Sequence, residues 1–177
     1  MTTPEDSRQL QACLPGLRRY ARALVGGLQA DDLVQDTVER AWRKLDQWQR
    51  GGEMRPWLFS IMHNLHLDQL RRPGLALQEL DDDSVLPAPE RAPGQAIAIG
   101  EMDAALARLP LGQREVILLV ALEQMPYEQV AATLGIPVGT VMSRLSRGRE
   151  KLRALLDGRP AGGHGVPAEL ADQARMF

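Results

Sequence analysis

The stretch Tyr127–Arg153, YEQVAATLGIPVGTVMSRLSRGREKLR, predicts a helix-turn-helix. Its first helix is expected to end at Gly135, because glycine can adopt the left-handed conformation that terminates a helix. Pro137 cannot continue that helix but fits near the start of the next one. Apolar side chains at helical spacing can close a seam between the two helices, namely Val130, Leu134, Ile136, Val141, Leu145 and Leu152.

The second helix of this motif is strongly basic. From Thr140 to Arg153 it carries five basic side chains and one acidic one, whereas the whole chain has a net charge of -2. Such a helix suits a DNA major groove, with its N-terminal end against base edges and its flank against phosphates. A solvated basic face on an ordinary helical hairpin is the alternative.

The 177 residues can hold one ordinary domain or two small ones. Helical periodicity dominates, with neither an alternating strand pattern nor an internal repeat. No apolar run is long enough to cross a bilayer, and the polar start Met1–Asp6 is unlike a secretory signal, so a cytoplasmic protein is expected. The single cysteine, Cys13, cannot form an internal disulfide and is expected to be a small core residue.

Three helices are expected in the N-terminal part of the chain. The first covers residues 5–25 and is interrupted or restarted at Pro15–Gly16. The second runs from about Ala30 to Gln47, and the third begins near Pro56 and ends near Arg71. The pattern then fails: residues 76–95 contain one basic and five acidic side chains together with several prolines, which disfavours a packed core.

Helicity resumes after this acidic segment, at about Gln95–Leu109 and Gly112–Glu123, ahead of the helix-turn-helix. The expected fold class is therefore all-α, with two small helical domains joined by a flexible acidic linker. The expected boundaries are residues 5–73 for the N-terminal domain, 74–94 for the linker, 95–157 for the C-terminal domain and 158–177 for a disordered tail.

The order of these features resembles the extracytoplasmic-function (ECF) class of bacterial RNA polymerase sigma factors over about residues 10–156. The segments Asp31–Trp42, Arg55–Arg72, Leu109–Leu119 and Tyr127–Arg153 carry the resemblance. In that family they grip the polymerase, melt and read the -10 element, begin the C-terminal domain and read the -35 element. The resemblance implies an alternative sigma factor that binds core RNA polymerase and promoter DNA, directs transcription initiation and is controlled by an anti-sigma factor.

The resemblance assigns polymerase binding to the second helix. Asp32, Gln35, Asp36 and Glu39 lie at i, i+3, i+4 and i+7 and form a polar, acidic stripe. In the family this face binds the coiled-coil clamp of the beta-prime subunit, and a positively charged partner helix would fit it. A solvated helix face is the alternative.

The third helix supplies the residues assigned to -10 recognition and melting, which are Arg55, Phe59, Asn64, Arg71 and Arg72. Unpaired bases need a stacking surface or a pocket and a cationic path for the backbone. Arginines suit the phosphates, and Asn64 can both donate and accept hydrogen bonds. Phe59 lies off the apolar face that Trp57 shares with Ile61, and the resemblance places a flipped base against the loop Gln49–Met54.

The candidates for -35 recognition are Thr140, Ser143, Arg144, Ser146, Arg147 and Arg149. Arginine can read guanine edges or hold phosphates, and the sequence does not sort the two. Two residues depart from the family pattern. Met142 stands where a basic residue is frequent, and Pro126 stands where a serine commonly caps the first helix of the motif.

Catalysis and metal binding are not expected. His63 and His66 are three residues apart, but no cysteine or third histidine is near them in the sequence, so we expect no metal and no cofactor. The chain has neither a phosphate-cradling glycine loop nor a nucleophile with a matched base, which argues against an enzyme. The alternatives are a stand-alone helix-turn-helix transcriptional regulator and a protein-interaction module such as an anti-sigma factor.

Overall fold

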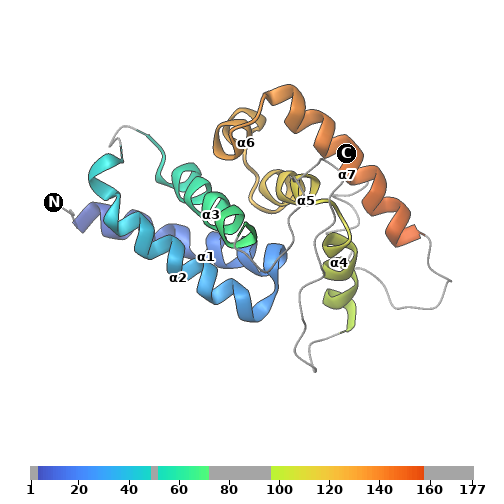
Figure 1. Cartoon of the computed structure of the whole chain (residues 1–177), viewed down its shortest axis with the longest axis horizontal. Helices are drawn as coiled ribbons and strands as arrows, with labels where there is room; N and C mark the ends of the chain where they lie inside the picture. The colour runs from blue at the N-terminus through green and yellow to red at the C-terminus, as the bar shows by residue number, and fades with distance from the viewer. Residues whose placement is uncertain (1–3, 49–51, 72–96, 158–177) are drawn as a thin grey trace.

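The computed structural model describes residues 4–48, 52–71 and 97–157, and all regular structure in these ranges is helical, which confirms the all-α prediction (Figure 1). The elements are α1 (Pro4–Val25), α2 (Gly27–Arg43), η1 (Leu45–Gln47), α3 (Met54–Leu70), α4 (Ile97–Ala107), α5 (Leu111–Ile117), η2 (Leu118–Leu122), α6 (Tyr127–Leu134) and α7 (Val138–Asp157). The expected linker 74–94, the expected tail 158–177 and Arg72 lie outside the described residues.

The N-terminal unit consists of α1, α2, η1 and α3, and α1 lies alongside α2 (Figure 1). Its core includes the fully buried side chains of Leu17, Tyr20, Leu33 and Leu58. The expected break at Pro15 is wrong, because α1 runs through this position without interruption. Pro15 is exposed, and the buried stripe on the opposite face of α1 holds the helix through the missing hydrogen bond.

The C-terminal unit contains the predicted helix-turn-helix, formed by α6 and α7 with α5 behind them. Gly135 adopts φ 65° and ψ 35°, the left-handed conformation expected at the end of the first helix. Four members of the predicted seam are buried, and Ile136 and Leu152 are half-buried; the buried four are Val130, Leu134, Val141 and Leu145. The seam prediction is therefore confirmed.

The helix expected over Gly112–Glu123 changes its winding along its length. It is α-helical over Leu111–Ile117 and π-helical over Leu118–Leu122, where the amide of Glu123 donates to the carbonyl of Leu118 at 3.0 Å. The next residue, Gln124, has φ 52°. The π turn and this left-handed residue reverse the chain between α5 and α6 and place Glu123 at the reversal.

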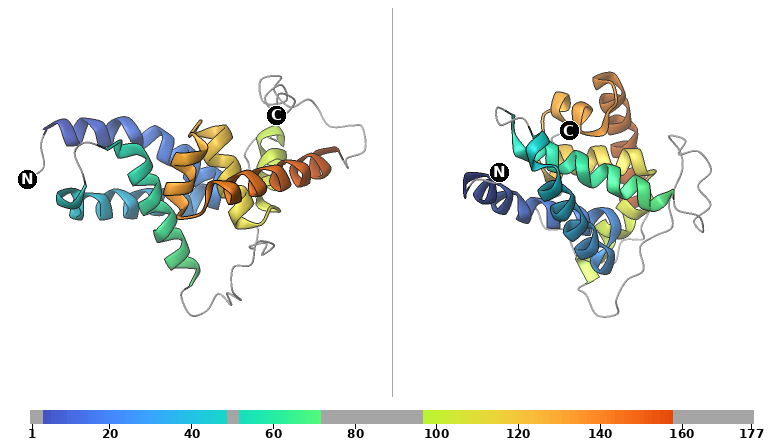
Figure 2. Two further views of the ribbon diagram at one scale, coloured as in Figure 1. Left: turned by 90° about the horizontal axis from the view of Figure 1, so that it is seen from above. Right: turned by 60° about the vertical axis from the view of Figure 1, so that its left-hand side comes forward.

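The two units pack against each other in what we call the closed arrangement. α6 lies beside α3, and η2 lies beside α1 (Figures 1 and 2). One continuous cluster of buried apolar side chains includes Leu24 and Met62 of the N-terminal unit and Leu119 and Met125 of the C-terminal unit. The sequence patterns that predicted two helical units gave no indication of this contact.

Gly135 offers a direct test of the turn. No atom lies within 4 Å of a Cβ built on this residue, so a side chain there meets backbone strain and no steric clash. Gly135→Ala should lower the free energy of unfolding by about 1–2 kcal/mol, measured by urea denaturation. Gly139→Ala is the matched control: its Cβ also meets nothing within 4 Å, but the residue is helical, so stability should stay the same or rise by up to about 1 kcal/mol. Equal losses in the two variants would contradict the assignment.

His66 on α3 predicts a pH dependence of stability. It is 5% exposed, its Nε2 atom has no hydrogen-bond partner, and burial lowers its pKa from 6.5 to about 4. Because the unfolded chain takes up this proton near pH 6.5, the free energy of unfolding should fall between pH 6.5 and 4, by about 3 kcal/mol in full. His66→Leu should remove this part of the decline in the free energy of unfolding, measured by chemical denaturation at each pH. Identical declines in both proteins would show that His66 is not its source.

Candidate functional site

α7 turns a polar face away from its seam with the rest of the C-terminal unit. Ser143, Ser146 and Arg147 are exposed, whereas Thr140, Arg144 and Arg149 are half-buried. On the opposite face Gly148 is buried, and a Cβ there would lie 2.8 Å from Cδ1 of Ile117, so α7 packs closely on α5. The six residues predicted for DNA contact therefore occupy the outer face and the two flanks of one helix.

The side chain of Arg144 lies against the first turn of α5. Its guanidinium lies over Gly112 in the first turn of α5: a Cβ on that glycine would be 2.8 Å from Nη1 and 3.0 Å from Cζ. The absence of a side chain at Gly112 leaves the guanidinium room to rest against α5. Sequence analysis gave no signal for this contact.

The acidic stripe on α2 faces solvent. All four of its residues are exposed, and Arg43 forms an ion pair with Glu39 one turn away; the four are Asp32, Gln35, Asp36 and Glu39. The stripe borders a groove between α1 and α2 with a volume of about 770 Å³. The groove is lined by Leu14, Arg18, Arg22, Asp31, Val34, Gln35, Val38, Glu39 and Trp42.

The groove joins apolar and charged groups in a way that the sequence stripe did not predict. Trp42 is 40% exposed at this groove. Arg18 and Arg22 of α1 face Asp31 and Glu39 of α2 across the groove. This surface therefore offers an aromatic anchor together with charges of both signs, which is a composition common in protein interfaces.

The residues assigned to -10 recognition differ in their environment. Asn64 is exposed, and its Nδ2 atom donates to the carbonyl of Ser60 at 2.8 Å, while Arg71 is exposed at the end of α3. Phe59 corrects the prediction: it is 1% exposed and packs edge-on against Tyr20 with ring centroids 5.2 Å apart. α3 packs against α1 as well as against α2, so a position off its first apolar face can still be buried. In the closed arrangement the Phe59 ring is not available to stack on a base.

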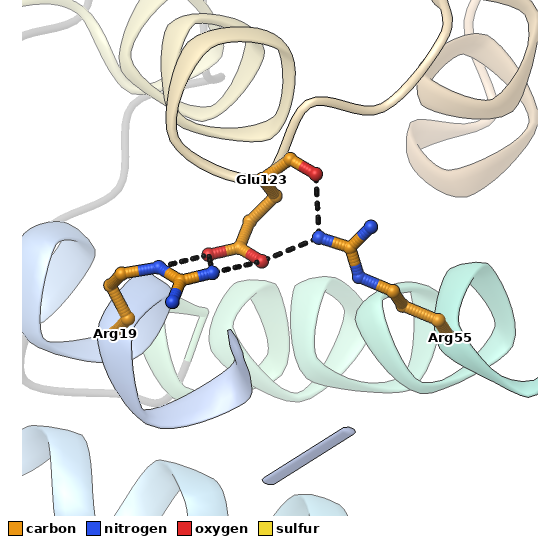
Figure 3. Close-up of polar contacts among 3 residues, drawn as sticks. All are labelled: Arg19, Arg55 and Glu123. Atoms are coloured by element: carbon orange, nitrogen blue, oxygen red, sulfur yellow. Dashed lines mark hydrogen bonds and ion pairs between the residues drawn. The ribbon is translucent and has the colours of Figure 1, made fainter. Parts of the chain in front are cut away.

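Arg55 and Arg19 converge on Glu123 at the boundary between the units (Figure 3). Arg19 donates from Nε to Oε1 at 2.9 Å and from Nη2 to Oε2 at 3.0 Å. Arg55 donates from Nη2 to Oε2 at 2.6 Å and to the backbone carbonyl of Glu123 at 2.5 Å. We call these three residues the Glu123 ion cluster. The role of Arg55 toward DNA stays a prediction, because this arginine is engaged within the protein here.

The exposures within this cluster are uneven. The Glu123 side chain is 0% exposed, whereas those of Arg19 and Arg55 are 50% and 40% exposed. A carboxylate buried without partners is strongly unfavourable, so the two arginines make its position possible. The carboxylate belongs to one unit and both cations belong to the other, so the cluster exists only while the units are in contact.

Further polar contacts cross the same boundary. Arg114 is 2% exposed and donates to the carbonyls of Leu24, Ala107 and Leu109 at 3.1, 2.6 and 3.1 Å. It thereby satisfies carbonyl groups at the end of α1, at the end of α4 and just after α4. The Nδ1 atom of His63 lies 2.7 Å from Oε1 of Glu115, which connects α3 with α5.

The described ranges contain neither a metal-binding cluster nor a membrane-spanning helix. Among those residues, no three histidine, cysteine, aspartate or glutamate side chains are placed to hold a metal ion. Within the same ranges, no helix is both long and apolar enough to cross a bilayer.

Comparisons with known proteins agree with the division into two units. The family model described as the Sigma2 domain of PhyR matches residues 10–63, and the one described as Sigma-70, region 4, matches residues 99–152. The ECF RNA polymerase sigma factor EcfG of Rhodopseudomonas palustris is 40% identical over 148 residues, which cover 82% of this chain and 81% of that protein.

Two solved structures share the fold. The sigma factor RpoE of Bartonella quintana, in complex with the anti-sigma factor NepR, gives a TM-score of 0.73 at 32% identity and covers 89% of this chain and 100% of that one. CnrH in complex with the cytosolic domain of CnrY gives a TM-score of 0.66 at 30% identity, with 87% and 88% covered. With its sigma-2 and region-4 units and these relatives, the chain belongs to the ECF family of RNA polymerase sigma factors, which direct RNA polymerase to promoters.

Proposed function

We propose that this sigma factor works in two arrangements and that the closed one is its resting form. The observation that carries the proposal is the packing of α6 on α3, together with the engagement of Arg55 by Glu123. Both occupy the helix that the family resemblance assigns to the -10 element. The unit assigned to the -35 element thus covers part of the surface that must meet the other promoter element.

The spacing of the two promoter elements, compared with the size of the packed chain, supports a separation of the two units. Elements named for positions -10 and -35 lie about 25 base pairs apart, which is ~85 Å of B-DNA. A compact body of this size has a radius of gyration of only ~15 Å. The stretch of chain between Leu70 and Ile97 is long enough to reach ~90 Å when fully extended, so the two units can separate while they remain linked.

In the open form, α7 enters the major groove of the -35 element. Its exposed hydroxyl and guanidinium groups, among them Ser143 and Arg147, meet base edges and phosphates. α3 meets the -10 element through Asn64 and the basic residues at its two ends. The side chains predicted from sequence keep their roles here, apart from Phe59, whose ring stays in the core of the N-terminal unit.

The stripe on α2 and the adjoining groove bind the polymerase. Asp32 and Asp36 supply exposed negative charge, and Trp42 at the groove supplies the apolar anchor. Neither surface is covered in the closed arrangement, so the polymerase can capture the resting form before the units separate. The protein acts in the cytoplasm, where promoter and polymerase are found, and catalyses no reaction of its own.

An anti-sigma factor controls the balance between the two arrangements. The Bartonella quintana relative was solved with such a partner, and its fold covers 89% of this chain. A partner that binds the closed arrangement better than the open one stabilises the resting form by that difference in affinity.

The polymerase assignment predicts the effect of charge reversal on α2. Asp32→Lys combined with Asp36→Lys should weaken binding to core RNA polymerase at least tenfold, about 1.4 kcal/mol, because like charges then face the clamp. Glu128→Lys, an exposed reversal on α6, is the control and should bind as the wild type does. Binding is measured by fluorescence anisotropy of the labelled full chain. Undiminished affinity of the double variant would exclude the stripe as the polymerase site.

The -35 assignment predicts a separate defect for α7. Arg147→Ala should leave polymerase binding intact and reduce run-off transcription from a selected promoter by about tenfold or more, the effect of losing one base or phosphate contact. Lys151→Ala, an exposed change one turn further along α7, should have a smaller effect. A wild-type chain that binds promoter DNA tightly without polymerase would instead favour a stand-alone regulator.

A further inference from the structure

The Glu123 ion cluster contains an anion site whose cationic side belongs wholly to the N-terminal unit. Arg19 comes from α1 and Arg55 from α3 (Figure 3). Both side chains are partly exposed beside the buried carboxylate. The anion comes from the other unit, at the chain reversal after η2. Separation of the units therefore removes the anion and leaves the pair of cations in place.

The geometry of this site suits an oxyanion with several oxygen atoms. Arg19 grips two oxygens at once with Nε and Nη2, at 2.9 and 3.0 Å. Arg55 donates to one of these oxygens and also to the neighbouring carbonyl oxygen. A two-pronged guanidinium contact of this kind binds phosphate as readily as carboxylate.

Gly16 leaves room for the Glu123 carboxylate. A Cβ on this residue would lie 2.8 Å from Oε2 of Glu123, closer than real side chains come. The helix α1 therefore presents bare backbone where the carboxylate sits. Any larger residue at this position would push the anion away from Arg19 and Arg55.

Opening leaves an unfavourable charge arrangement unless another anion arrives. Two guanidinium groups that shared one carboxylate repel each other once it departs. We propose that Arg19 and Arg55 form a phosphate-binding site for promoter DNA, and that Glu123 occupies this site in the closed arrangement. Carboxylate and phosphate then compete for the same two arginines. This inference rests on the proposed function, in which the open chain binds the promoter.

DNA is favoured over an acidic protein surface by the position of the site. Arg55 stands in the first turn of α3, the helix assigned to the -10 element, and Asn64 is exposed on the same helix. The acidic stripe for polymerase lies on a different helix, α2, which contributes nothing to the ion cluster. Arg19 was not among the residues that the sequence pointed to, and it now joins the promoter-binding set.

The test uses the full chain assembled with core RNA polymerase and a labelled promoter duplex. Promoter affinity is measured at several salt concentrations, because each neutralised phosphate adds about 0.9 to the slope of log affinity against log salt. Glu123→Gln removes the competing charge with little change of shape. It should raise promoter affinity several-fold and enlarge the free protein in small-angle X-ray scattering.

The phosphate contact itself is isolated by a second change in the same background. Arg19→Gln added to Glu123→Gln should lower the slope by about one unit relative to Glu123→Gln alone. Arg8→Gln is the matched control, because Arg8 is exposed on α1 and forms an ion pair with Glu5 on the same helix. It should leave the slope unchanged. Should Glu123→Gln fail to fold in thermal melting, Arg19→Gln and Arg8→Gln in the otherwise unchanged chain give the same comparison.

Three outcomes would overturn the proposal. An unchanged slope after loss of Arg19 would show that no phosphate binds there. If loss of Arg19 weakened only the binding of core polymerase in the absence of DNA, the site would contact an acidic surface of the polymerase. Unaltered promoter affinity in Glu123→Gln would show that the Glu123 carboxylate does not compete with DNA phosphate for this site. Failure of the wild-type holoenzyme to bind any promoter would instead contradict the proposed function, which separates the two claims.

Discussion

The burial of the Glu123 carboxylate is the constraint on which the closed arrangement depends. A carboxylate with no exposure needs cationic partners, and both of its partners belong to the other unit. Two local features serve this contact: the π turn places Glu123 at the chain reversal, and Gly16 leaves room for it. The polar contacts are set in a continuous apolar core, so charge and hydrophobic burial act together.

The same constraint explains how a closed chain can serve a protein that must open. Each unit has its own helices, and the helix-turn-helix has a buried seam of its own. The surfaces assigned to polymerase and to the -35 element stay exposed in the closed form, whereas part of α3 is covered. Interfaces between domains that combine apolar and ionic contacts are commonly reversible. On opening, contacts between the units are replaced by contacts with DNA. Arg55 is the clearest case, because it leaves Glu123 and binds promoter phosphate.

Sequence periodicity predicted the helices, the left-handed Gly135 and the seam of the helix-turn-helix, because these depend on residues close together in the chain. It was wrong about Pro15, where packing along α1 outweighs the missing hydrogen bond, and about Phe59, where a second packing partner buries the ring. It gave no sign of the pair Arg19 and Glu123, which are 104 residues apart. Charged side chains far apart in sequence carry no periodic signal, so only the packed structure brings them together.

The most direct test of the two-arrangement account is the distance between the units with and without polymerase. Gln29→Cys on α2 and Lys151→Cys on α7, both exposed positions, would carry a dye pair in a Cys13→Ser background, read by single-molecule energy transfer. The account predicts one short distance in the free chain. In the promoter-bound holoenzyme it predicts a distance several tens of ångströms longer, because the two units then bridge ~85 Å of DNA. The same short distance in both states would contradict it.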